Sequence, residues 1–106
     1  MITRKKTRKN CNLPVTIGFI HGTIQNISES GFMAIMRGYI KSGMTHFITI
    51  QFPNNLVTYK GRINRFEPMQ ENLRPTGFIF EDLREDSFEK KKLLEFIGTN
   101  NGEKTA

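Results

Sequence analysis

Residues 46–66 read HFITIQFPNNLVTYKGRINRF and predict two β-strands joined by a tight turn. Apolar and polar side chains alternate over residues 46–52, which is the period-two pattern of a strand with one buried face. Pro, Asn and Asn at 53–55 are turn residues, and a longer strand is expected over residues 56–66. Gly61 interrupts the apolar parity of this second strand, and a glycine inside a strand often marks a bulge or a bend in a curved sheet.

Four other segments of the chain have the composition of β-strands. They lie at 13–20, 22–27, 32–36 and 74–81, and short turn signals separate them. The apolar face expected for the first segment is Leu13, Val15, Ile17 and Phe19. Five or six short strands at regular spacing, followed by one helix, indicate a small β-barrel.

The end of the chain has a helical pattern instead. Asp86 or Ser87 is expected to cap a helix over residues 88–97 that stops at Gly98. Residues 90–92, three lysines, are expected on its solvated face. The stripe expected to face inward is Leu93, Leu94 and Ile97.

A chain of 106 residues and 12.3 kDa is long enough for one domain. The predicted fold is all-β with one C-terminal helix, a six-stranded antiparallel β-barrel whose helix covers one opening. We expect a flexible basic leader at 1–10, the barrel with its closing helix at 11–98, and a disordered tail at 99–106.

The positive charge of the protein is concentrated in one part of the chain. The formal net charge is +6, but residues 1–80 hold eleven basic and three acidic groups, whereas residues 81–106 hold five basic and seven acidic groups. The densest part is residues 4–9, with five positive charges in six residues. Such a leader should attract a phosphate-bearing partner. The alternative is a solvated segment that binds nothing.

Several classes of function find no support in the sequence. The single cysteine, Cys11, excludes an internal disulfide and a cysteine-based zinc site. His21 and His46 lack partners at a metal-ligand spacing, and no catalytic motif is present. We therefore expect no enzyme activity, metal or cofactor. Without an apolar segment long enough for a membrane span or a signal peptide, we expect a cytoplasmic protein that does not insert into a membrane.

Two polar features remain as candidates for binding. Arg4 and Arg8 stand four residues apart on the leader, and a guanidinium grips phosphate bidentately or lies flat on a nucleobase. Asn26, Ser28 and Gly31 lie in a polar turn between two strands, where they offer an amide, a hydroxyl and an open backbone. The same residue types also serve any ordinary hairpin turn.

Together these features resemble the PilZ domain, the bacterial receptor module for cyclic di-GMP. The family order is Arg-x-x-x-Arg and then, after about twenty residues, Asp or Asn-x-Ser-x-x-Gly. It stands here as Arg4-Lys-Lys-Thr-Arg8 and Asn26-Ile-Ser-Glu-Ser-Gly31. The resemblance runs from about residue 4 to residue 97 and includes the Gly77-Phe78-Ile79-Phe80 segment and the closing helix.

The resemblance assigns a role to each matching residue. It implies that Arg4 and Arg8 clasp the phosphates and guanine faces of cyclic di-GMP and that Asn26 contacts guanine. Ser28 would be a polar ligand contact, and Gly31 would shape the loop. An Asn in place of Asp removes a carboxylate that could pair with guanine, so a lower affinity is expected. We further expect the ligand to order the cationic arm, and a downstream protein to carry the signal to motility or biofilm control.

Two alternatives stay open at this stage. One is a basic barrel that binds single-stranded nucleic acid, in which exposed aromatic side chains would stack on bases. We assign most of the aromatic residues to the core, which leaves Tyr39 and Tyr59 for such a role and makes nucleic acid the less favoured partner. The other alternative is a PilZ-like adaptor that has lost its ligand.

Overall fold

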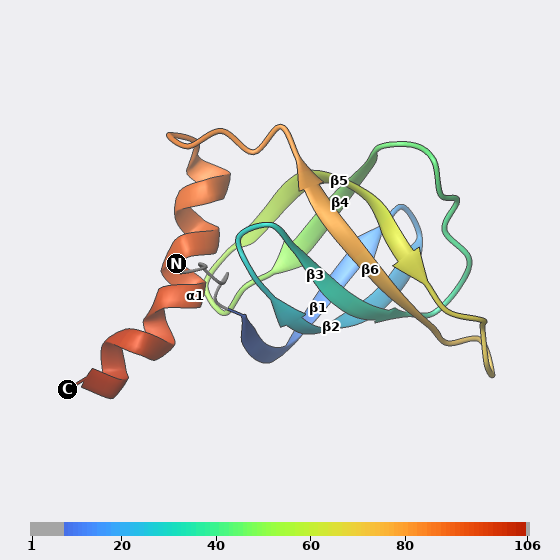
Figure 1. The fold of residues 1–106 in the computed structure, drawn as a ribbon, viewed down its shortest axis with the longest axis horizontal. Coiled ribbons are helices and arrows are strands. Elements are labelled where there is room, and N and C mark those ends of the chain that lie inside the picture. The colour runs from blue at the N-terminus through green and yellow to red at the C-terminus, as the bar shows by residue number, and fades with distance from the viewer. Residues whose placement is uncertain (1–7, 106) are drawn as a thin grey trace, which may run out of the picture.

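The computed structural model describes residues 8–105, with side chains described for residues 8–98. Six antiparallel strands close into a barrel in the order β1-β2-β3-β6-β5-β4, and one helix follows at the C-terminal end (Figure 1). This architecture confirms the predicted fold class. The elements are β1 (Lys9–Ile17), β2 (Ile20–Ile27), β3 (Gly31–Met36), β4 (His46–Gln51), β5 (Leu56–Phe66), β6 (Arg74–Glu81) and α1 (Phe88–Thr105).

The first strand begins and ends earlier than the sequence predicted. It starts at Lys9, so the last two residues of the expected leader belong to the barrel. The alternating sequence pattern does not reach this start, because a register shift between Asn10 and Leu13 breaks the alternation of side chains. The strand ends at Ile17, which pairs with Ile20 across a two-residue turn.

The turn between β1 and β2 explains why Phe19 does not join the core. Gly18 has a φ of +62°, and a glycine with positive φ at the first central position is typical of a tight hairpin. Phe19 occupies the second position and is 98% exposed. Leu13, Val15 and Ile17 face the core as predicted.

Alternating side chains from all six strands fill the barrel. The buried apolar residues of the strands include Ile24, Ile27, Ala34, Met36, Ile48, Ile50 and Val57. Tyr59 is also buried, and Phe32, Phe52, Phe78, Phe80 and Phe96 lie in or against this core. Phe19, Phe47, Phe66 and Phe88 are exposed, which the sequence did not predict.

Helix α1 lies beside one end of the barrel (Figure 1). Its cap is Ser87, whose hydroxyl accepts a hydrogen bond from the backbone N–H of Lys90 at 3.1 Å. Leu93 and Ile97 are buried as predicted, but Leu94 is exposed. Phe96 takes its place, with its ring centroid 5.3 Å from that of Phe52, since residues 93, 96 and 97 share a helix face.

The predicted helix end at Gly98 is wrong. The helix runs to Thr105 and includes residues 99–105, for which the sequence predicted disorder. Gly98 is not among the residues with positive φ, so it stays in the helix at a cost of about 1 kcal/mol relative to Ala. Within the described part of the chain, no helix is long and apolar enough to cross a membrane.

Candidate functional site

The turn between β2 and β3 is held by Ser28. Its backbone N–H donates to the carbonyl oxygen of Gly31 at 2.8 Å. Its hydroxyl accepts from the N–H of Ser30 at 3.2 Å and lies 3.4 Å from the Gly31 carbonyl oxygen, to which it donates. The side chain is 1% exposed. In this position Ser28 fixes the shape of the turn, and its direct contact with a ligand stays a prediction.

Gly31 is required by the contact between β3 and β6. It pairs with Ile79, and a Cβ built on Gly31 would lie 2.0 Å from the carbonyl oxygen of Phe78. No side chain fits at that distance. The glycine therefore lets the start of β3 approach β6, and a hydrogen bond from the N–H of Phe80 to the carbonyl oxygen of Ser30, 2.9 Å long, joins the turn to the same strand.

Arg8 brings the leader to this turn. Its Nη1 donates a hydrogen bond to Oδ1 of Asn26 at 2.5 Å. Asn26 is half-buried on β2, beside a register shift that lies between Ile24 and Asn26 in the pairing of β2 with β3. The structure thus joins the second Arg of the first motif to the first residue of the second motif. Arg4 lies outside the described residues.

A small cavity of about 190 Å³ opens at the same place. Arg8, Ser30 and Gly31 line it, and so do Asn64 and Arg65 from β5. Pockets that enclose a drug-sized ligand measure roughly 300–1,000 Å³. This cavity would therefore hold only part of a dinucleotide, and the remainder would lie over the open surface beside it.

Sequence reasoning missed Asn64 and Arg65. A register shift lies between Ile63 and Arg65 in the pairing of β5 with β6, and the extra residue there is Asn64. Such a bulge re-aims the side chains around it. Gly77, the partner of Arg65 on β6, makes room for it, because a Cβ at Gly77 would lie 3.3 Å from Cγ of Arg65. The only signal in the sequence was an Asn inside a strand, where this residue is disfavoured.

The cavity is electrostatically positive. Arg8 and Arg65 both line it, and no acidic residue of the described chain does. Arg65 also pairs with Glu67, whose Oε2 lies 4.0 Å from Nη2 of Arg65. Both of these side chains are exposed, so the pair is weak. The arrangement favours an anion with two or more acceptor oxygens.

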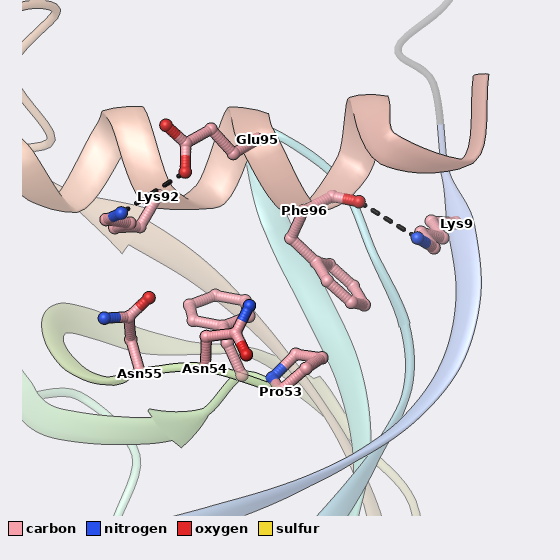
Figure 2. A pocket seen from close by; sticks show the side chains of 8 residues that line it. Lys9, Pro53, Asn54, Asn55, Lys92, Glu95 and Phe96 are labelled. Atoms are coloured by element: carbon pink, nitrogen blue, oxygen red, sulfur yellow. Dashed lines mark hydrogen bonds and ion pairs between the residues drawn. The ribbon is translucent and has the colours of Figure 1, made fainter. Parts of the chain in front are cut away.

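The start of β1 and the β2–β3 turn are both connected to helix α1. Nζ of Lys9 donates to the carbonyl oxygen of Phe96 at 3.0 Å and lies 4.1 Å from the centroid of its ring. Figure 2 shows this contact beside a second cavity, of about 280 Å³, between the helix and the β4–β5 turn. Lys9 thus joins the start of β1 to the helix.

The second connection corrects the expectation that Lys90 is solvated. Lys90 is buried, and its Nζ lies 3.8 Å from an oxygen of Glu29 and 3.4 Å from an oxygen of Glu85. Glu29 belongs to the turn between β2 and β3. The ion pair with Glu29 therefore links the first turn of the helix to the turn that carries the second motif.

Comparisons with known proteins agree with this fold. The family model of the PilZ domain matches residues 3–98. Among solved structures, the chain is similar to the inhibitor of motility MotI/DgrA of Bacillus subtilis, with a TM-score of 0.77 and 16% sequence identity. The similarity covers 100% of this chain and 55% of that protein, so the chain spans about half of its length. The comparison with curated proteins gave no match. Because the family model covers the whole barrel and most of the helix, the chain belongs to the PilZ domain family.

Proposed function

We propose that this protein is a receptor for cyclic di-GMP, and that the ligand binds at the cavity beside Arg8 and the β2–β3 turn. PilZ domains are generally receptors for this second messenger and are binding or adaptor modules rather than enzymes. The observation that carries the proposal is the hydrogen bond from Arg8 to Asn26. It brings together two motifs that lie 18 residues apart, at a cavity lined by arginines and by no acidic residue that the structure describes.

The residues of the site have distinct roles in this proposal. Arg8 binds a phosphate bidentately or offers a flat surface on which guanine stacks. Arg4 supplies a second guanidinium group with the same role. The amide of Asn26 both orients Arg8 and reads the guanine edge. Ser28 and Gly31 position the turn and the adjoining strand, because their side-chain and backbone contacts are used within the fold.

The signal would leave the site through the arm and the helix. In the absence of an anion the five charges of residues 4–9 repel one another, and a doubly anionic ligand would offset part of this repulsion and order the arm on the barrel. Lys9 at Phe96 and Glu29 at Lys90 would pass this change to α1. A downstream protein would read the result. Motility is a candidate process, since the structural neighbour is an inhibitor of motility.

The test is a calorimetric titration of the protein with cyclic di-GMP. Each charge-assisted hydrogen bond contributes about 1.5–3 kcal/mol, so Arg8→Ala should weaken binding by roughly tenfold to 150-fold. Arg84→Ala is a matched control, because Arg84 is exposed and its ion pair within the described residues is with the exposed Asp86, at 3.7 Å. Equal affinity of the Arg8→Ala variant and the wild type would refute the assignment.

A second titration separates the receptor from a nucleic-acid-binding barrel. A single-stranded oligonucleotide would release several counterions, so its binding would weaken steeply between two salt concentrations. A compact dinucleotide should show a shallower dependence on salt. Nucleic acid would be favoured as the ligand by two results together. The oligonucleotide would bind tightly with a steep salt dependence, and the affinity for cyclic di-GMP would be no higher than the affinity for GTP.

A further inference from the structure

The end of the barrel opposite α1 carries a cluster of exposed apolar side chains. Phe19 is 98% exposed, Phe47 66%, Tyr39 62% and Met44 44%. We call these four residues the end patch. They come from the β1–β2 turn, the segment between β3 and β4, and the start of β4. The β1–β2 turn and the β3–β4 segment lie on the side of the barrel away from the helix (Figure 1).

The fold does not account for these side chains. The conformation of the β1–β2 turn requires a glycine at position 18. It does not require an aromatic residue at position 19, where small polar residues are common. Phe47 sits on β4 opposite Lys60 and points out of the barrel. Single exposed apolar residues are ordinary, but a contiguous group of them on a soluble protein marks an interaction site.

The end patch surrounds an open cavity of about 760 Å³. Ile17, Ile20 and Ile40 line it together with the four patch residues, so its walls are mostly apolar. A concave apolar wall of this kind accepts protruding side chains of another molecule. A flat lipid surface would cover the rim of such a hollow but would leave its floor unfilled.

The charged side chain that lines the cavity is basic. Lys41 and His46 line it, and no acidic residue within residues 8–98 does. Arg37 is exposed just before Tyr39, and neither Arg37 nor Lys41 forms an ion pair with a residue that the structure describes. Arg74 adds a third cation, with its guanidinium carbon 5.1 Å from the centroid of the Tyr39 ring. The nearby Glu81 is already bonded to Thr45 and Arg62.

We propose that the end patch docks a protein segment that carries apolar anchor residues flanked by Asp or Glu. The anchors would fill the cavity, and the acidic flanks would lie against Arg37 and Lys41. A second copy of this chain fits less well, because it would bring a basic rim against a basic rim on a molecule of net charge +6. The site is separate from the proposed ligand site and at the opposite end of the barrel from α1.

The first test screens a library of displayed random peptides for those that bind to the 106-residue protein. Enriched peptides should contain an aromatic or aliphatic residue beside Asp or Glu. A synthetic peptide of that sequence should bind at least tenfold more weakly to Phe19→Ser and to Lys41→Glu. Phe88→Ser, which removes an exposed Phe on α1, should bind it like the wild type. Peptides without an excess of acidic residues, no enriched peptide at all, or equal binding to Phe19→Ser would each overturn the proposal.

Two further measurements test the other occupants. Sedimentation should show a monomer over the working concentrations, and a dimer that Phe19→Ser dissociates would assign the end patch to a second copy. Flotation with vesicles of phosphatidylcholine and phosphatidylglycerol should show no binding that depends on Phe19. Vesicle binding that is lost in Phe19→Ser would assign the patch to an anionic membrane surface instead.

Discussion

Replacing Gly31 by Ala tests whether this residue serves the fold or the ligand. The added Cβ would lie 2.0 Å from the carbonyl oxygen of Phe78, whereas real Cβ contacts are essentially never below 3.0 Å, so β3 and β6 would have to separate locally by 1.0 Å. Overpacking of this kind costs about 1–3 kcal/mol. A strained backbone hydrogen bond between the two strands adds about 1 kcal/mol. We expect the free energy of unfolding to fall by about 2–4 kcal/mol.

Urea unfolding followed by far-UV circular dichroism measures this loss directly. For a domain of this size, 1 kcal/mol corresponds to a shift in Tm of roughly 4–8 °C, so the melting temperature in a thermal scan should fall by about 8–32 °C. Gly98→Ala is the control, because a Cβ there meets nothing within 4 Å, and this change should leave stability unchanged or raise it by up to about 1 kcal/mol. If Gly31→Ala keeps wild-type stability but loses cyclic di-GMP affinity, the glycine serves the ligand and the packing argument is wrong.

Three other predictions concern the ligand site, the core and the helix cap. Arg65→Gln should weaken cyclic di-GMP binding by roughly tenfold or more in calorimetry, without changing stability because the side chain is exposed; unchanged affinity would remove Arg65 from the site. Burial, followed by the charge of Glu89, raises the pKa of Tyr59. In the unfolded chain Tyr ionises near pH 10, whereas the folded protein keeps Tyr59 protonated to a higher pH. The free energy of unfolding is therefore unaffected by this ionisation below about pH 10, and above it falls by up to about 1.4 kcal/mol per pH unit. Tyr59→Phe should flatten that alkaline decline in urea titrations, and an identical decline in both proteins would contradict the assignment. Ser87→Ala should lower the free energy of unfolding by about 1 kcal/mol. A loss below about 0.5 kcal/mol, the low end of the effect of a cap, would mean that the N–H of Lys90 finds another acceptor.

The sequence predicted most strands because their pattern is local. Alternation placed Val15, Ile48 and Phe78 inside the barrel, and each of them is buried. The same reasoning failed at Phe19, because alternation continues across a two-residue turn although the chain reverses there. It also failed at Lys90. The buried ammonium group of Lys90 pairs with Glu29, which lies 61 residues earlier in the chain, and no local pattern predicts such a pair.

The amino-acid sequence by itself determined the fold class, the family and the two motifs that carry Arg8 and Asn26, because each depends on residues close together along the chain. Only the tertiary structure decided which side chains share a cavity. A bulge in β5 brings Arg65 to the motif residues, and the closure of the barrel gathers Phe19, Tyr39 and Phe47 at one end. The register of paired strands fixes both outcomes, and that register is set by contacts between residues far apart in the chain.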